Sequence, residues 1–351
     1  RKHWLLARAN MADSPNFLIW ASLTTFALVV IVSIMGLFGG NQMPVEGKTI
    51  LITGGSEGMG LAAARQLSAK GANIVIAARS VDKLESAIKE IQAAAKNPAS
   101  QRFHYISVDV AKPAYAGPLI AEATQWNNGR SLDIVWCIAG IATPQLFLDM
   151  EMDSMRRHMD VNYFGTAEMS HAILKEWLAV DAPIEKEARH LILTCTTAIF
   201  LDVPGYLPYV TSKWAIRGLA DTLKLELELY PQNVQIHLVC PGTILSAAFE
   251  REQKVKPGIT KKIEEMDPEQ TPEEVAERAI KKLEAGQYMI TVNWFGALMR
   301  WGALGSSRDS ILDTIMAALL ALFMPIVLFV MGSDVKTWKK KYGHPETWKK
   351  E

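Results

Sequence analysis

The stretch Thr49–Gly60, TILITGGSEGMG, joins a run of apolar and β-branched residues to a loop rich in glycine. Helical periodicity follows over Leu61–Lys70, so the stretch predicts a strand, a tight loop and a helix in succession. Glycine has no Cβ, which lets the backbone approach a phosphate, and the following helix N-terminus offers N–H donors to that anion. A glycine triplet alone also occurs in ordinary turns. Its place between the first strand and the first helix predicts a nucleotide site.

Strand and helix patterns alternate from Gly47 to about Ile290. Helical stretches such as Ser80–Ala95 separate short apolar runs, and the polar run Asp181–Arg189 is typical of a loop. Continuous apolar strands between helices indicate a parallel sheet covered on both faces. The pattern predicts an α/β fold, a Rossmann-like doubly wound parallel sheet. The expected strands are Thr49–Thr53, Asn73–Ala78, Phe103–Val108, Asp133–Ile138, His190–Cys195 and Val234–Val239.

Charge and cysteine usage disfavour several classes of function. Lys plus Arg and Asp plus Glu each number 37 among 351 residues, so the net charge is zero and nothing suggests nucleic acid as a partner. Cys137, Cys195 and Cys240 lie far apart without CxxC spacing, which favours buried reduced thiols over metal ligands or disulfides. None of the seven histidines belongs to a ligand cluster, and we predict no metal.

Two apolar segments flank the middle region and divide the chain into three parts. Residues 1–43 contain a predicted transmembrane anchor at about 17–38, residues 44–292 form the nucleotide-binding domain, and residues 293–351 hold a membrane-associated segment with a basic tail. The run Phe17–Phe38 carries no charge and has the length that a bilayer-spanning helix needs. The alternative, a cleaved signal peptide, usually has a shorter apolar core.

The second apolar segment, Ile315–Met331, is interrupted by Pro325 and is followed by several lysines. Basic flanks favour the cytosolic side of a membrane. A surface-lying or re-entrant segment would keep the domain and the tail on that side, and an amphipathic helix at an oligomer interface is the alternative. The preceding stretch Asn293–Gly305 looks interfacial through Trp294, Phe295, Arg300 and Trp301.

The end of the second strand bears on the choice of cofactor. An NAD-selective site usually places a carboxylate there to bind the ribose 2′-hydroxyl. This chain has Ala78 at that position, followed by Arg79. A guanidinium binds a 2′-phosphate through charge-assisted hydrogen bonds, whereas a carboxylate would repel it. We therefore expect NADP(H) as the cofactor, the alternative being that Arg79 is a solvated charge.

Tyr209 and Lys213, in the sequence YVTSK, are the strongest candidates for chemistry. Residues four apart share one face of a helix. A nearby ammonium favours the phenolate and would lower the pKa of Tyr209, which then serves as a general acid when a hydride reaches a carbonyl carbon. The YxxxK pattern alone is common, but its place well downstream of the glycine loop is specific.

The spacing Thr53-Gly54-x-x-x-Gly58-x-Gly60 resembles the TGxxxGxG loop of the short-chain dehydrogenase/reductase superfamily. The resemblance implies a catalytic tetrad of Tyr209, Lys213, Thr196 and Asn162. Thr196 departs from the family's serine, and Thr194 and Thr197 flank it. Asn162 would hold a water that links the lysine to solvent. The cofactor contacts that the resemblance implies are Gly54, Ser56, Glu57, Gly58, Gly60, Arg79, Lys83, Asp109, Val110, Ala139, Gly140, Tyr209, Lys213, Pro241, Gly242 and Thr243.

Asp109 and Cys137 each leave a point open. Asp109, which resembles the adenine-contacting acid of the family, also reads as a helix N-cap. Cys137 replaces an asparagine that relatives usually carry two residues before Ala139, which puts a side-chain hydrogen bond there in doubt.

The segment Pro241–Glu265, PGTILSAAFEREQKVKPGITKKIEE, resembles the fungal 3-ketodihydrosphingosine reductases. That resemblance implies NADPH-dependent reduction of 3-ketosphinganine to dihydrosphingosine at the endoplasmic reticulum membrane, with the catalytic domain facing the cytosol. The charged run Glu250–Pro272 predicts a mobile insertion or lid, within an insertion at about 245–272. Apolar residues expected near the substrate or the membrane are Ile141, Leu146, Phe147, Tyr206, Phe249 and Trp294.

Alternatives to that substrate remain open at this point. Very-long-chain 3-ketoacyl-CoA and steroid or retinol are other substrates of membrane-bound members of the superfamily. The departures at Thr196 and Cys137 also fit a non-catalytic nucleotide-binding scaffold. Besides the long-chain sphingoid ketone, the expected partners are membrane lipid and a second copy of the chain in a homo-oligomer.

Overall fold

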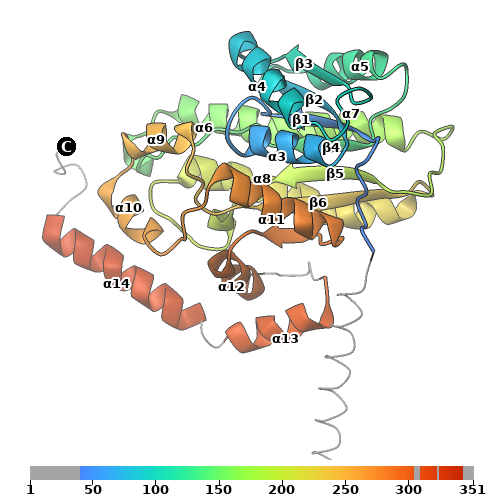
Figure 1. Cartoon of the computed structure of the whole chain (residues 1–351). Coiled ribbons are helices and arrows are strands. Elements are labelled where there is room, and N and C mark those ends of the chain that lie inside the picture. Colours follow the sequence, from blue (N-terminus) through green and yellow to red (C-terminus); the bar gives the residue numbers. More distant parts are fainter. Residues whose placement is uncertain (1–39, 304–308, 322–323, 343–351) are drawn as a thin grey trace, which may run out of the picture.

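The computed structural model describes residues 40–303, 309–321 and 324–342 (Figure 1). The anchor predicted at 17–38 lies outside these residues. In the described part, one parallel sheet forms the centre of the molecule and helices lie on both of its faces. The α/β, Rossmann-like prediction is therefore confirmed.

Seven strands form this sheet in the order β3-β2-β1-β4-β5-β6-β7, and all neighbouring strands are parallel. Each of the six predicted strands is present, with ends within one residue of the prediction. A further strand, β7, was not predicted, because its three residues are too few to show a period. The bounds are β1 Thr49–Thr53, β2 Asn73–Ala78, β3 Phe103–Ser107, β4 Ile134–Cys137, β5 Arg189–Thr194, β6 Val234–Cys240 and β7 Met289–Thr291.

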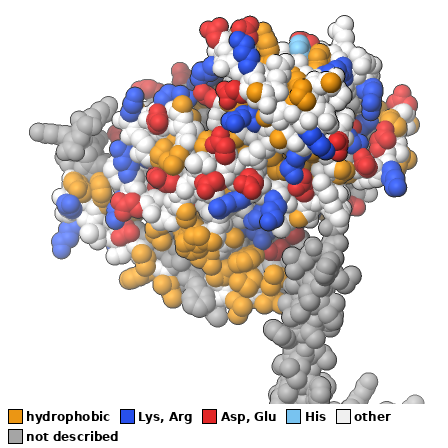
Figure 2. Space-filling model, viewed as in Figure 1, with side chains coloured by type: hydrophobic (Ala, Val, Ile, Leu, Met, Phe, Trp, Pro, Cys, Tyr) orange, Lys and Arg blue, Asp and Glu red, His pale blue; other side chains and the backbone are white. Residues whose placement is uncertain are grey.

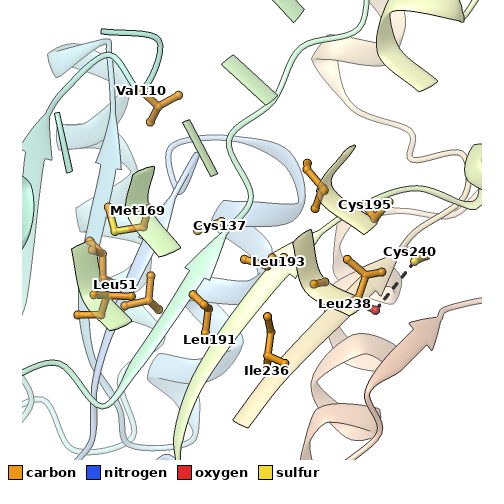
Figure 3. Close-up of a cluster of buried hydrophobic side chains, with 14 of the residues drawn as sticks. Leu51, Val110, Cys137, Met169, Leu191, Leu193, Cys195, Ile236, Leu238 and Cys240 are labelled. Atoms are coloured by element: carbon orange, nitrogen blue, oxygen red, sulfur yellow. Dashed lines mark hydrogen bonds between the residues drawn. The ribbon is translucent and has the colours of Figure 1, made fainter. Parts of the chain in front are cut away.

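Two helical layers bury the sheet. The helices α3 (Gly58–Ala69), α4 (Val81–Ala93) and α11 (Pro272–Glu284) contribute to one apolar core, and α5 (Ala116–Trp126), α7 (Gly165–Trp177) and α8 (Leu207–Glu226) to the other. Because strand side chains alternate between faces, Leu51 belongs to the second core while Ile50 and Ile52 belong to the first. Figure 3 shows part of the second core, where Cys137, Cys195 and Cys240 lie buried as free thiols.

The strand order reverses direction between β1 and β4. Successive strands from β1 to β3 step outward on one side of β1, and β4 to β7 step outward on the other. In such sheets ligands bind in the crevice at the carboxyl ends of the strands where the order reverses. The loops after β1 and β4, which begin at Gly54 and Ile138, lie at this point.

The charged insertion is folded rather than irregular. Its residues form α9 (Ala247–Gln253) and α10 (Gly258–Glu264), and Ile259 and Ile263 are buried. Thr260 Oγ1 donates a hydrogen bond of 2.6 Å to the carbonyl oxygen of Pro204, which ties α10 to the segment before α8. Isoleucines spaced four apart give this charged segment an apolar side, and its role as a mobile insertion or lid stays a prediction.

The segment predicted to be interfacial packs one side against the protein. In α12 (Trp294–Gly302), Phe295 is buried, and Arg300 and Trp301 donate hydrogen bonds of 2.8 and 2.9 Å to Asp313 Oδ1. Only Trp294 keeps the expected exposure, at 68%. The interfacial prediction is wrong for the other three, since a buried carboxylate at the start of α13 (Ile311–Leu320) holds the two polar ones.

The second apolar segment is divided between α13 and α14 (Met324–Tyr342). Among the described residues, no helix combines the length and the apolar character needed to cross a bilayer. Trp338 of α14 packs against Gly258 at the start of α10, where a Cβ would lie 2.6 Å from the indole ring. The remaining elements are the helix α6 (Met152–His158), the short helical turns η1 (Phe147–Asp149), η3 (Thr197–Ile199) and η4 (Leu227–Leu229), and the π-helical turn η2 (Met159–Phe164).

Candidate active site

The loop after β1 is tight because its glycines allow it. Gly54 and Gly58 have φ angles of 74° and 56°, a region that residues with a Cβ rarely adopt. A Cβ on Gly60 would overlap the carbonyl oxygen of Gly54, and one on Gly54 would lie 2.7 Å from the backbone nitrogen of Ala139. The predicted loop glycines and Ala139 therefore lie together at the strand-order reversal.

The helix that follows this loop lacks a side-chain cap. Its N-cap residue, Glu57, makes no capping hydrogen bond. Glu57 instead accepts hydrogen bonds from Lys83 Nζ at 2.6 Å and Arg251 Nη2 at 3.3 Å, and the bond from Lys83 contributes most to lowering the pKa of Glu57. The N–H groups of the first turn of α3, next to Ser56, therefore fit an anion such as a pyrophosphate.

Arg79 lies immediately after β2, and its side chain is exposed. Within the part of the chain that the structure describes, its guanidinium makes no ion pair. Ser107 Oγ, on neighbouring β3, donates a hydrogen bond to the Arg79 backbone oxygen at 3.1 Å. The end of β2 therefore carries no carboxylate at Ala78 and an exposed guanidinium at Arg79, as the sequence predicts.

Asp109 and Val110 lie in the turn after β3. Asp109 Oδ1 accepts a hydrogen bond from Ala111 N at 3.1 Å, and its carbonyl oxygen accepts one from Lys112 N. No helix begins at this turn, since α5 starts at Ala116, so the helix N-cap alternative was wrong. Val110 is buried against Gly165, where a Cβ would come within 3.0 Å of the Val110 oxygen.

Asn162 lies in η2, a single π-helical turn between α6 and α7. Such turns often occur at functional sites. The Asn162 amide accepts from Ile141 N at 2.8 Å and donates to Ile141 O at 3.0 Å and to Ser212 Oγ at 2.9 Å. A Cβ on Gly140 would lie 3.2 Å from Asn162 Oδ1 and 3.5 Å from Lys213 Nζ. Asn162 thus joins the loop after β4 to α8.

Tyr209 and Lys213 share one face of α8, as predicted. The Lys213 side chain is buried, its Nζ donates to Thr194 O at 2.9 Å, and it lies 5.8 Å from the centroid of the Tyr209 ring. Burial lowers the pKa of Lys213. Burial also raises the pKa of Tyr209, so the net shift is opposite to the expected lowering, and the contribution of Lys213 to the phenolate stays a prediction. The ammonium lies over the ring face and is bonded elsewhere, rather than at the phenol oxygen.

Of the three candidate threonines, Thr196 faces Tyr209. A hydrogen bond with Thr196 lowers the pKa of Tyr209, against the larger effect of burial. Thr194 Oγ1 accepts instead from the Trp136 indole at 3.1 Å. Thr197 packs against α12, where a Cβ on Gly296 would lie 2.7 Å from its methyl group. The structure therefore brings together Thr196 and Tyr209, as the sequence count predicts.

The turn after β6 is held by residues that were not predicted. Asp267 Oδ2 accepts from Thr243 N at 2.6 Å and Thr243 Oγ1 at 3.0 Å, and Asp267 Oδ1 accepts from Asn293 Nδ2 at 3.0 Å. A Cβ on Gly242 would lie 2.6 Å from the Asp267 carboxylate. Pro241 O accepts from Thr197 N at 2.9 Å, which links this turn to the loop after β5.

A cavity of about 200 Å³ opens beside Tyr209 and Thr196. Phe249 and Tyr206, two of the apolar residues predicted near a substrate, line it. Its walls also include acidic residues of the insertion, Glu252 and Glu264, which sequence reasoning missed. A larger groove of about 570 Å³ adjoins it, since Val203 and Ile263 line both, and the predicted Leu146 and Phe147 lie in this groove.

Comparison with known proteins agrees with this geometry. The family model described as short chain dehydrogenase matches residues 48–256, a range that holds the glycine loop, Tyr209 and Lys213. The chain belongs to the short-chain dehydrogenase family. The resemblance inferred from the TGxxxGxG spacing is thereby confirmed.

Among relatives of this short-chain dehydrogenase, a 3-ketodihydrosphingosine reductase of Neurospora crassa is 47% identical over 98% of each chain. One of Aspergillus fumigatus is 42% identical over 91% of this chain and 92% of its own. A solved short chain dehydrogenase/reductase from Burkholderia phymatum, in complex with NAD, has a TM-score of 0.63 at 20% identity and covers 74% of this chain and 94% of its own. The chain is an oxidoreductase with the fold of these structures.

The residues of this short-chain dehydrogenase fit a nicotinamide dinucleotide. The closely packed glycines and the uncapped first turn of α3 form a cradle in which backbone groups are accessible. The loop after β4 and the turn after β6 meet the same end of the sheet. Within the described residues, no cluster of three or more His, Cys, Asp or Glu is arranged as a metal site, and the absence of a metal stays a prediction.

Proposed function

We propose that this chain reduces 3-ketosphinganine, a long-chain 2-amino ketone, to sphinganine with NADPH. The observation that carries the proposal is the cavity in which Tyr209 and Thr196 present hydroxyl groups beside the nucleotide cradle. A proton donor, a second hydroxyl and a nicotinamide site are what carbonyl reduction requires. The extent of similarity to 3-ketodihydrosphingosine reductases supports this substrate.

In the proposed mechanism, Thr196 and Tyr209 donate hydrogen bonds to the ketone oxygen and orient the carbonyl. The bound cofactor would supply a hydride to the carbonyl carbon. Tyr209 gives its proton to the oxygen, which completes the secondary alcohol and leaves a tyrosinate. Burial keeps Tyr209 protonated before this step, and the Lys213 ammonium, 5.8 Å from the ring centroid, stabilises the anion after it.

Asn162 acts on this site by holding α8 in place. Its amide donates to Ser212 Oγ, and Ser212 Oγ donates to the Tyr209 carbonyl oxygen at 2.7 Å. Because the amide also bonds both backbone groups of Ile141, it fixes the catalytic helix against the loop after β4. The water-holding role expected for Asn162 stays part of the proposal.

Arg79 supports the choice of NADPH over NADH. Its exposed guanidinium lies at the strand end where a ribose 2′-phosphate is expected, and Ala78 supplies no carboxylate there. Lys83 is the second base near the cradle, but its ammonium is held by Glu57. Arg79 is therefore the residue that we assign to the 2′-phosphate.

The adjoining groove suits a long alkyl chain. It is lined mainly by apolar residues from the loop after β4, the segment before α8, α10 and α14. Since Val203 and Ile263 line both spaces, a chain attached to a ketone at Tyr209 can continue into the groove. Gly332 and Val335 give α14 a direct part in binding the substrate chain.

The C-terminal helices support attachment to a membrane. Trp294, Phe329 and Ile326 are 68%, 75% and 59% exposed, and Figure 2 shows a broad hydrophobic surface in the lower part of the molecule over α12 and α13. Such a surface is typical of contact with lipid. We propose that this surface rests on the endoplasmic reticulum membrane, into which a lipid ketone would partition. The catalytic domain then lies in the cytosol.

Purified full-length chain in detergent micelles, mixed with 3-ketosphinganine and NADPH, provides the test. NADPH oxidation is followed by absorbance and sphinganine by mass spectrometry. The Tyr209→Phe variant should lose roughly 10²- to 10⁴-fold in turnover, the usual contribution of a general acid, while still binding NADPH. Absence of sphinganine with wild-type chain, or faster reduction of a 3-ketoacyl-CoA or a steroid, would overturn the proposal.

A further inference from the structure

A charged cluster from the insertion forms one wall of the catalytic cavity. The Lys256 side chain has no solvent exposure, and its Nζ lies 2.6 Å from Glu264 Oε2. The rings of Phe249 and Tyr206 lie over this ammonium at 4.7 and 5.4 Å. Lys256 and Glu264 therefore neutralise each other inside an aromatic enclosure.

Glu252, in the same wall, has no cation in direct contact among the described residues. Its Oε2 accepts a hydrogen bond of 3.0 Å from the neutral hydroxyl of Tyr206. Among the described residues it forms no ion pair, since Lys256 is bonded to Glu264 and Arg251 to Glu57. The cavity thus holds a carboxylate whose charge no protein cation cancels by direct contact.

Burial makes this arrangement costly without a ligand. Burial raises the pKa of Glu252 to about 6, which leaves the group mainly ionised at neutral pH. The charges of Lys256 and Arg251 offset part of this cost, and a cation in direct contact with the carboxylate would offset more of it. Asp267, the third acid of the wall, is already bonded to Thr243 and Asn293, and Glu264 to Lys256, so Glu252 is the acid left for a ligand.

Glu252 also lies close to the reacting group. Its charge is one of the causes that raise the pKa of Tyr209. Tyr206, which bonds to Glu252, has its ring centroid 5.7 Å from that of Tyr209. In a 2-amino ketone the amine is on the carbon next to the carbonyl. A carbonyl bound to Tyr209 can therefore place its amine in the cavity that Glu252 also lines.

We propose that Glu252 binds the ammonium group of a 2-amino ketone and thereby selects this class of substrate over neutral or anionic ketones. The inference rests on the proposed function and deepens it by assigning the residue that recognises the substrate's head. Acyl-CoA thioesters and steroids carry no cation next to their ketone, so the same carboxylate gives them no stabilisation and repels phosphate-bearing ones.

Two ketones of equal chain length test the assignment: 3-ketosphinganine and its des-amino analogue, a 1-hydroxy-3-ketone. Full-length wild type, Glu252→Gln and Glu250→Gln are compared for kcat and KM. Gln keeps an acceptor for Tyr206 but removes the charge, and Glu250→Gln removes the same charge from an exposed position of α9. For the amino ketone, Glu252→Gln should raise KM roughly 10- to 100-fold, as expected for a charged hydrogen bond.

The des-amino ketone should show no such loss in Glu252→Gln, and Glu250→Gln should behave as wild type with both ketones. Glu252→Asp should restore part of the preference for the amine. Equal loss on both ketones, or no loss on either, overturns the assignment even where the reductase activity stands. If wild type reduces neither ketone, the proposed function fails. Calorimetric binding of sphinganine against the matching diol, in wild type and Glu252→Gln, then decides the ammonium site independently.

Discussion

At the scale of the residue, threonine at position 196 preserves the chemistry of serine. Its side chain makes a hydrogen bond with Tyr209 and caps η3 by accepting from Ala198 N at 3.3 Å. The additional methyl group occupies a buried position in the cavity wall. The hydroxyl at this place thus serves the local structure and, in the proposed mechanism, the carbonyl.

Two variants of Thr196 test the hydroxyl and the methyl group separately. Thr196→Val has nearly the same shape without the hydroxyl, and we expect kcat for 3-ketosphinganine to fall roughly 10²- to 10³-fold, the usual cost of losing one donor to a developing oxyanion. Thr196→Ser keeps the hydroxyl, and its kcat for 3-ketosphinganine should stay within about threefold of the wild-type value. Steady-state kinetics measure both. Full activity of Thr196→Val would exclude the role.

A second prediction concerns Arg79. Arg79→Ala removes the charge assigned to the 2′-phosphate, and KM for NADPH should rise roughly 10- to 100-fold because a charge-assisted hydrogen bond is lost. NADH carries no 2′-phosphate, so its kinetics should not change. Parallel titrations of both nucleotides provide the measurement. A matched control is Arg65→Ala, a half-buried arginine of α3 paired with Glu90 and Glu273. Equal losses for both nucleotides would contradict the assignment.

The sequence predicts the site residues that belong to local patterns, but not those whose contacts are distant along the chain. Tyr209 and Lys213 are predictable because both lie on one helix face, and Gly54 and Gly60 because they follow a strand directly. Glu252 and Asp267 are different: Glu252 bonds to Tyr206, which is 46 positions away, and Asp267 to Thr243, which is 24 positions away. No periodicity records contacts between a charged insertion and a distant loop, so only the folded chain reveals them.

At the scale of the element, strands were easier to predict than the helices of the insertion. The long buried strands show continuous apolar runs, whereas β7 has three residues and α9 and α10 have seven each. Helices this short gain most of their stability from tertiary contacts rather than from intrinsic propensity. Buried Ile263 and Lys256, together with the Thr260–Pro204 bond, supply those contacts here.

The third prediction concerns α14 as a wall of the alkyl groove. A Cβ on Gly332 would meet no atom within 4 Å, so Gly332→Ala should fold normally and retain activity. Gly332→Phe places a ring in the groove, and kcat/KM for a long-chain sphingoid ketone should fall about tenfold or more, since each methylene displaced from an apolar contact costs roughly 0.8 kcal/mol. A short-chain 2-amino ketone should be reduced at the wild-type rate. A uniform loss across chain lengths would exclude the groove as the chain site.

At the scale of the whole molecule, the catalytic domain and the C-terminal helices form one continuous structure. Arg300 and Trp301 of α12 bind Asp313 of α13, and Trp338 of α14 packs on α10. The sheet architecture follows from the alternation of strand and helix patterns and was predictable. The placement of α12 was not, because its aromatic and basic residues suit a membrane interface and a buried contact equally well.

The last prediction follows from the exposed hydrophobic residues of these C-terminal helices. Burial of such side chains in a lipid interface is favourable by up to about 1.5–3 kcal/mol each, whereas a charge placed among them is not. The double variant Ile326→Glu/Phe329→Glu should therefore raise KM for 3-ketosphinganine presented in phosphatidylcholine vesicles by about tenfold or more, while kinetics with a water-soluble short-chain 2-amino ketone stay unchanged. Ile184→Glu, at a 66% exposed position in the loop between α7 and β5, is the control and should leave both values unaltered.

Because the readout is delivery of substrate from vesicles, it reports on this surface even when another segment holds the chain at the membrane. Unchanged KM for vesicle-borne ketone in the double variant would show that these helices have no part in drawing substrate from lipid.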